Sequence, residues 1–228
     1  MGTLAAYRAL IGNRNLLRFF TGEFISGIGD WLYLVALLVI VYRETNDPLL
    51  LGIVGGARII PYIVLSVPAG VIVDRFDRRL ILIVTDLIRA AAMVGMALVA
   101  WLDGPVLLII GLAIFATCFA VFFRPSLGAY LPSLVKDEAQ LGPANSAFAT
   151  LGELSFIVGP AIGGILIAAT DLALAFAINA VTFIVADIVL WTLPANRPGD
   201  KAAASAEAAP SEPAATDREP ATAPASAA

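Results

Sequence analysis

Long apolar stretches alternate with short polar ones along most of the chain. An α-helix needs about 20 consecutive apolar residues to cross the hydrocarbon core of a bilayer. Turn-forming residues, such as Asn46-Asp47-Pro48 and Asp103-Gly104-Pro105, separate the apolar stretches. The pattern therefore predicts six transmembrane helices, at about 19–42, 50–73, 80–102, 106–124, 143–169 and 172–193.

The composition favours a membrane protein and excludes a soluble one. Hydrophobic residues make up 60% of the chain, charged residues 14%, and the mean hydropathy is +0.90. A soluble domain of this size needs more polar residues to cover its surface. We therefore predict an all-α integral membrane protein that is surrounded by the lipid bilayer. The net charge of −4 indicates no nucleic-acid partner.

The chain lacks residues that metal binding, acid–base catalysis, disulfide formation and ATP binding usually require. The chain has no histidine, which removes the commonest metal ligand and the usual general base near neutral pH. Its single cysteine, Cys118, excludes a disulfide within the chain. The Gly-x-x-x-x-Gly-Lys loop that binds ATP does not occur. We therefore expect no enzyme activity, no cofactor and no metal site, and any proton chemistry must fall to carboxylates.

Basic residues gather on one side of the predicted spans. Among the basic residues outside the spans or at their ends, Arg43 lies on one side. The others lie on the opposite side: Arg8, Arg14, Arg18, Arg75, Arg78, Arg79, Arg124, Lys136, Arg197, Lys201 and Arg218. Lys and Arg accumulate on the cytoplasmic side of membrane proteins. We therefore predict a multi-pass protein of the cell membrane with both termini in the cytoplasm.

The composition divides the chain into three parts. Residues 1–18 form an N-terminal cytoplasmic segment, and residues 19–193 form the six-helix transmembrane domain. Residues 194–228 are rich in Ala, Pro, Ser, Thr and Glu and contain no aromatic residue. Such a segment cannot bury enough apolar surface to offset the entropy of ordering, so we expect a disordered cytoplasmic tail.

The loop between the second and third spans holds the densest group of charges. Its notable positions are Gly70, Asp74, Arg75, Arg78 and Arg79. This spacing resembles the loop motif of the major facilitator superfamily, except that Asp77 replaces the usual glycine. The resemblance implies a gating loop whose Asp74 contacts a helix of the opposite half of a transporter. A loop that only sets membrane topology is the alternative.

A second motif lies in the fifth span and consists of Ser155, Gly159, Pro160, Gly163 and Gly164. It resembles the antiporter motif of the same superfamily, which is associated with exporters, although serine replaces two of its glycines. Small residues at every fourth position let helices approach closely. Proline removes a backbone hydrogen bond and bends the helix. Ordinary helix packing is the alternative to an exporter motif.

Shorter stretches, including Phe24–Trp31, Ala57–Pro61 and Tyr130–Val135, resemble the macrolide-efflux and enterobactin-exporter branch of this superfamily. Its members normally have two six-helix halves, each built from two inverted three-helix repeats, with the substrate bound between the halves. This chain has the length of one half, the N-terminal one. The resemblance therefore implies a second six-helix half as partner, supplied by a homodimer or a separate chain.

Charged residues also lie inside the predicted spans, namely Glu23, Asp30, Arg58, Asp86, Arg89 and Glu153. Each unpaired charge at the centre of a membrane helix costs roughly 2.5–3.5 kcal/mol on an insertion scale. We therefore expect these side chains to turn inward, to pair or to meet water. Asp187 lies near the cytoplasmic end of the last span, and we expect it at the membrane interface.

Depth in the membrane predicts which charges meet. Asp30 lies about 11 residues above the cytoplasmic start of the first span, and Arg58 about 15 residues above the cytoplasmic end of the second, so a long arginine side chain bridges the difference. We therefore predict an Asp30–Arg58 pair. Asp86 and Arg89 share one helix face, and we expect them to brace the structure by pairing locally or with the charged loop.

The carboxylates in the spans are candidates for proton coupling. Glu153 lies near the middle of the fifth span without a partner on its own helix, and Asp30 lies well inside the first. Glu23 shares a helix face with Asp30. A carboxyl group at such a depth can cycle a proton. Static bracing between helices is the alternative for each of these charges.

Together these features favour half of a secondary active transporter. We predict that it exports small amphiphilic compounds, such as drugs or siderophore-like molecules, in exchange for protons and by alternating access. The alternatives are a non-transporting membrane subunit with an interaction or regulatory role, and a truncated transporter fragment that retains the fold.

The predicted orientation can be tested by cysteine labelling in a Cys118→Ala background. A cysteine at Glu44 should react with a membrane-impermeant maleimide in intact cells, because the loop between the first two spans faces outward. A cysteine at Phe76 should react only after the membrane is permeabilised. The reverse order of labelling would contradict the orientation.

Overall fold

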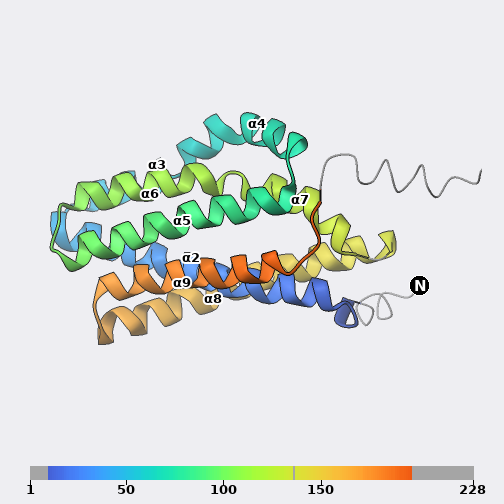
Figure 1. Ribbon diagram of the computed structural model, residues 1–228. Helices are drawn as coiled ribbons and strands as arrows, with labels where there is room; N and C mark the ends of the chain where they lie inside the picture. The colour runs from blue at the N-terminus through green and yellow to red at the C-terminus, as the bar shows by residue number, and fades with distance from the viewer. Residues whose placement is uncertain (1–9, 136, 197–228) are drawn as a thin grey trace, which may run out of the picture. The chain divides into compact units, whose positions relative to one another are not determined.

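The computed structural model describes residues 10–135 and 137–196, all within the compact unit Met1–Pro198. Regular structure in these ranges is entirely helical (Figure 1). The elements are α2 (Arg14–Thr45), α3 (Pro48–Ala57), α4 (Ile59–Arg75), α5 (Arg78–Trp101), α6 (Val106–Ala120), α7 (Phe123–Leu134), the 3-10 helix η1 (Glu138–Gln140), α8 (Leu141–Ala169) and α9 (Leu172–Trp191). The predicted all-α fold is confirmed.

Within these ranges, six stretches are long and apolar enough to cross a membrane. They are Arg14–Thr45, Pro48–Arg75, Arg78–Trp101, Val106–Leu134, Glu138–Ala169 and Leu172–Trp191. The second stretch is interrupted at Arg58, between α3 and α4, and the fourth at 121–122, between α6 and α7. The fourth stretch extends to Leu134, ten residues beyond the end at about 124 that the apolar pattern predicted.

The domain boundaries expected from composition are only partly within the described residues. Of the predicted N-terminal segment, residues 1–9 lie outside the described ranges, and α2 already begins at Arg14. Of the predicted disordered tail, residues 197–228 lie outside them. The division into three parts therefore stays a prediction.

Polar residues in the short loops start the helices. Asp47, Asp77 and Asp171 accept hydrogen bonds from backbone N–H groups in the first turns of α3, α5 and α9. Asn13 does the same for α2. These N-caps satisfy amide groups that have no partner within their own helix. The residues that interrupt the apolar pattern thus also set where the helices begin.

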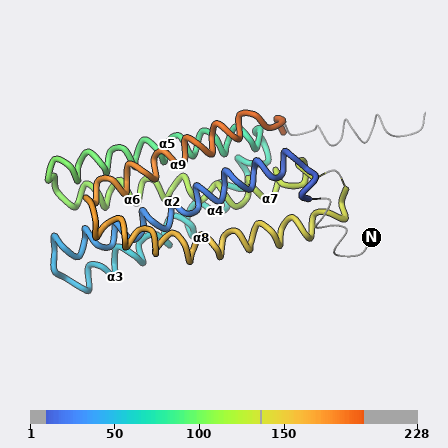
Figure 2. The backbone as a smooth tube through the Cα atoms, turned by 90° about the horizontal axis from the view of Figure 1, so that it is seen from below, coloured from blue at the N-terminus to red at the C-terminus, as the bar shows by residue number. Residues whose placement is uncertain are grey.

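Helix α9 is central to the packing. It packs along α5 and α2, while α8 packs on α2 and α6 packs on α5 (Figure 2). The second span is far less buried: in α4, the buried residues are Pro61, Ala69 and Val73. Most apolar side chains of α4 are exposed, and α3 and α8 also carry exposed apolar side chains, among them Leu49 and Ile157. In a membrane such faces lie against lipid or against another helical bundle.

The apolar core is split into two clusters, with a polar layer between them. Helices α2, α5 and α9 each contribute residues to both clusters. One cluster includes Leu32, Ala90 and Phe183. The other includes Phe20, Ile83 and Leu190 of the same three helices. The charged residues of the polar layer, which lie between these residues, are Glu23, Asp30, Asp86, Arg89 and Asp187.

Small residues let α8 approach α2 closely. Ser155, Gly159 and Gly163 are buried. A Cβ atom at Gly159 would lie 2.5 Å from Trp31 Cβ and 2.9 Å from the backbone oxygen of Ile28. The backbone oxygen cannot move aside without shifting the helix, so only glycine fits at this position.

We expect Gly159→Ala to lower the stability of the protein by about 1–3 kcal/mol, because the added methyl group overpacks the α2–α8 contact. Gly164→Ala is the matched control on the same helix, since a Cβ there meets open space. Thermal unfolding of the detergent-solubilised variants checks this. Equal melting temperatures for the two variants would contradict the close contact.

Candidate functional site

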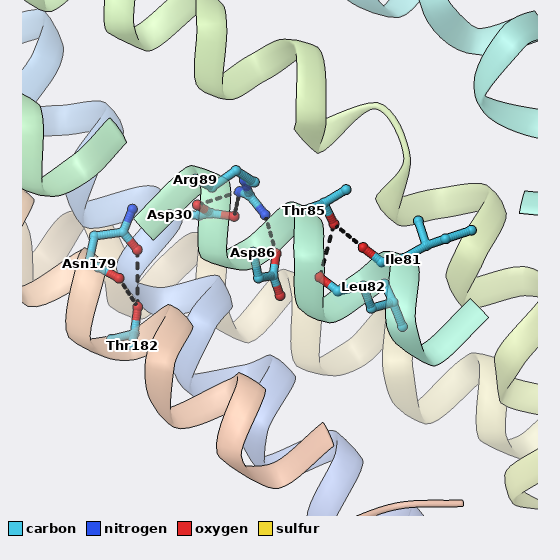
Figure 3. A network of polar contacts seen from close by, with 8 residues as sticks. All are labelled: Asp30, Ile81, Leu82, Thr85, Asp86, Arg89, Asn179 and Thr182. Carbon is cyan, nitrogen blue, oxygen red and sulfur yellow. Dashed lines mark hydrogen bonds and ion pairs between the residues drawn. The ribbon is translucent and has the colours of Figure 1, made fainter. Parts of the chain in front are cut away.

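The guanidinium group of Arg89 joins two carboxylates inside the polar layer (Figure 3). Its Nη2 donates hydrogen bonds of 2.8 and 2.7 Å to Oδ1 and Oδ2 of Asp30. Its Nη1 donates one of 3.1 Å to Oδ1 of Asp86. The guanidinium carbon lies 4.2 Å from the ring centroid of Phe183 on α9. One cation therefore links α2 and α5 across the face of an aromatic residue on α9.

The three charged side chains differ in their access to solvent. The Arg89 and Asp86 side chains are 10% and 3% exposed, whereas that of Asp30 is 37% exposed. Asp30 is therefore the less buried of the two carboxylates that Arg89 holds, and release of Asp86 would leave the more deeply buried charge unpaired.

Two further carboxyl groups, those of Glu23 and Asp187, lie near Asp86 and Arg89. Glu23 on α2 is 9% exposed and Asp187 on α9 is 7% exposed. Both interact electrostatically with Asp86 and Arg89. Neither oxygen of the Asp187 carboxyl group has a hydrogen-bond partner among the described residues. The layer thus holds four carboxyl groups around one guanidinium, more negative charge than a single cation can balance.

Close contact between α2 and α9 holds this layer together. A Cβ atom at Gly29 would collide with the side chains of Asn179 and Thr182. The Thr182 hydroxyl donates to the backbone oxygen of Asn179 at 2.8 Å and lies 3.0 Å from its Oδ1 (Figure 3). Glycine beside Asp30 therefore lets polar side chains of α9 reach the surface of α2.

The predicted Asp30–Arg58 pair is wrong. Asp30 pairs with Arg89, whereas the guanidinium of Arg58 lies 5.4 Å from the ring centroid of Tyr33. Arg58 lies at the break between α3 and α4. The position of a residue along its helix gives the height of the side chain in the membrane, but it does not give the helix face that the side chain occupies. The predicted local pair of Asp86 and Arg89 forms, but Arg89 also serves Asp30.

Asp187 is a functional candidate that the sequence analysis missed. It was expected at the membrane interface, but it is buried within the polar layer. The signal that could have found it is the general rarity of carboxylates in membrane helices, which applies to Asp187 as much as to Asp30. Its position near the end of the span hid it, because distance along the helix does not report contact with α5.

Glu153 lies apart from this network. Its side chain is exposed on α8 and makes no hydrogen bond or ion pair with another described residue. Its neighbour Ser155 is buried against α2, where the hydroxyl lies 3.4 Å from the backbone oxygen of Phe24. The structure therefore brings Glu23, Asp30, Asp86 and Arg89 together and leaves Glu153 on an open helix face.

The charged loop divides into an exposed part and a bound part. Asp74 and Arg75 are exposed. Arg79 instead donates hydrogen bonds to the backbone oxygens of Leu193, at 2.6 Å, and Trp191, at 3.1 Å, at the end of α9. These bonds satisfy carbonyl groups that the helix leaves free at its C-terminus.

The same contact continues into the segment after α9. The backbone N–H of Arg78 donates to the oxygen of Asn196 at 3.2 Å, and the backbone N–H of Asn196 donates to Asp77 at 3.3 Å. Asp77, which departs from the usual glycine of the motif, therefore caps α5 and also holds Asn196. At Gly70, the first position of the loop motif, an added Cβ would meet open space.

Of the motif in α8, Ser155, Gly159 and Gly163 face α2, whereas Pro160 is half-buried and Gly164 is exposed. Three of the five motif residues therefore pack against α2.

Comparison with known proteins places the chain in a family. The profile of the Major Facilitator Superfamily matches residues 19–225. The chain is 32% identical over 199 residues to the "Uncharacterized MFS-type transporter YfiS" of Bacillus subtilis (strain 168), covering 84% of this chain and 46% of that protein.

Two other relatives are named as export proteins. The chain is 29% identical over 189 residues to "Macrolide efflux protein A" of Streptococcus pyogenes, covering 81% of this chain and 46% of the relative. It is 34% identical over 164 residues to the "Putative bacilysin exporter BacE" of Bacillus amyloliquefaciens, covering 72% and 40%. The chain spans about half the length of the curated relatives it matches.

We expect Arg89→Gln to destabilise the protein by about 3 kcal/mol, because it leaves buried carboxylates without their cation. Arg43→Gln, at an exposed arginine at the end of α2, is the control and should change stability little. Adding Asp86→Asn to Arg89→Gln should restore part of the loss. Thermal unfolding in detergent measures all three, and equal melting of the two single variants would exclude a stabilising role for Arg89.

Proposed function

This chain belongs to the major facilitator superfamily, and from that membership we propose that it is half of a secondary active transporter that exports small amphiphilic compounds. The names of two relatives, a macrolide efflux protein and a putative bacilysin exporter, support export over uptake. The proposed activity is transport across the membrane, without a catalytic step.

The observation that carries the proposal is the buried polar layer of carboxyl groups around Arg89. Charged groups inside membrane helices are expensive, and they are retained where ions or protons move. We assign proton coupling to Asp30 and Glu23 in this layer and to Glu153 on α8. Because the chain has no histidine, carboxyl groups such as these are suited to bind and release a proton.

A second six-helix half is the proposed partner. Alternating access needs two bundles that move against each other around a substrate site. The open apolar faces of α3, α4 and α8 offer the surface for such a partner, and the exposed Asp74 of the charged loop is free to contact it. A second copy of the chain or a separately encoded half would serve.

The proposed setting is the cell membrane, with both termini in the cytoplasm. This orientation follows from the asymmetry of Lys and Arg and places the charged loop and the end of α9 on the cytoplasmic side.

The proposal is tested by ethidium uptake into inverted membrane vesicles that contain the chain, driven by an acidic lumen. We expect gradient-dependent uptake that falls to background in Asp30→Asn and Glu153→Gln, because neither variant can carry a proton at that position. Glu153→Asp, which retains the carboxyl group, should keep part of the activity.

The outcomes separate the two hypotheses. Uptake that persists without the gradient would contradict proton coupling. Inserted protein that gives no uptake, and whose Asp30→Asn variant changes only its assembly, would favour a non-transporting membrane subunit over a transporter.

A further inference from the structure

The carboxyl group of Asp187 is unusual among the charged groups of the described residues. It is 7% exposed, and both of its oxygens lack a hydrogen-bond partner there. It lies on α9 between Phe183 and Leu190, which belong to the two apolar clusters. An ionised carboxylate in such surroundings pays its desolvation cost without any compensating hydrogen bond.

The charged groups around Asp187 come from both helices that pack along α9. Helix α5 contributes Asp86 and Arg89, and α2 contributes Glu23, while Asp30 of α2 is paired with Arg89. Helix α8 also touches α9, but its Glu153 is exposed. If every carboxyl group here were ionised, one guanidinium would face four negative charges.

The hydrogen bonds of the Arg89 guanidinium show which carboxylates it binds. Asp30 takes two of its hydrogen bonds and Asp86 takes one. Asp187 takes none. The neutral, protonated form of Asp187 is therefore the form that fits this arrangement, because it adds no further negative charge to the layer.

We propose that Asp187 binds an exchangeable proton, and that loss of this proton makes Asp187 compete with Asp30 for Arg89. In this step the O–H bond of the Asp187 carboxyl group breaks, and the proton passes to water. The new carboxylate attracts Arg89, and Asp30 is the partner that Arg89 gives up, because Asp86 is the more deeply buried of the two and would be left as an unpaired buried charge.

The movement of Arg89 has a structural consequence. Arg89 links α2 and α5 in the protonated form, and after proton loss it links α9 and α5 instead. The contact between α2 and α9 beside Gly29 is then free to change. The use of this step in transport rests on the proposed function, whereas the proton site itself does not.

The proton site is tested directly by infrared spectroscopy of the purified full chain in detergent. The C=O stretching band of a protonated carboxyl group should be present at neutral pH and should weaken in Asp187→Asn. Glu44→Gln, at an exposed carboxylate at the end of α2, is the control and should leave the band unchanged. A band of equal intensity in wild type and Asp187→Asn would overturn the proposal.

Folding of the variant gives a second measurement. Asparagine resembles the protonated carboxyl group in shape and charge, so Asp187→Asn should melt at or above the temperature of the wild type at neutral pH. A large fall in melting temperature would show that Asp187 acts as an ionised brace and would overturn the proposal.

The vesicle assay then separates this inference from the proposed function. If wild type takes up ethidium along the gradient, Asp187→Asn should abolish that uptake, because Arg89 stays on Asp30. Wild-type uptake in Asp187→Asn would refute the coupling role of Asp187 and leave the proposed transport intact. If wild type shows no uptake, the proposed function fails, and the infrared band alone decides whether Asp187 holds a proton.

Discussion

The pairing of Arg89 with Asp30 and Asp86 is the interaction on which the interior of this membrane domain depends. Without a cation, a layer of buried carboxyl groups between two apolar clusters would not be tolerated in a bilayer. Arg89 is held by three hydrogen bonds and by the ring of Phe183, so its position is set by three helices at once. The same contacts of Arg89 therefore pair the buried charges and hold α2, α5 and α9 together.

The arrangement of helices follows from this. The spans that carry the polar layer, α2, α5 and α9, are also the most buried, because their charged faces must be shielded from lipid. The second and fifth spans carry few charges on buried faces and stay open on one side. The domain therefore has a well-packed interior and open apolar faces on these spans, which fits the proposal that a second six-helix half covers them.

The charged loop connects this interior to the end of the domain. Arg79 caps the carbonyl groups at the end of α9, and Asp77 and Arg78 hold Asn196 beyond it. Asp187 lies one turn before that end, on the same helix. The polar layer and the charged loop therefore both contact the same helix, α9.

The apolar pattern alone was enough to determine the six spans and the all-helical fold, because the length of an apolar stretch and the N-capping residues act locally along the chain. Periodicity also gave the small-residue face of α8, since glycine at every fourth position on one helix is visible in the sequence. The partners of the charged residues were a different matter. Depth suggested Arg58 for Asp30 and an interfacial place for Asp187, whereas the fold gave Arg89 to Asp30 and buried Asp187 beside Asp86. Tertiary structure decided these contacts because they depend on which helices are neighbours and which faces they turn to each other, and neither is recorded in the spacing of residues along a single helix.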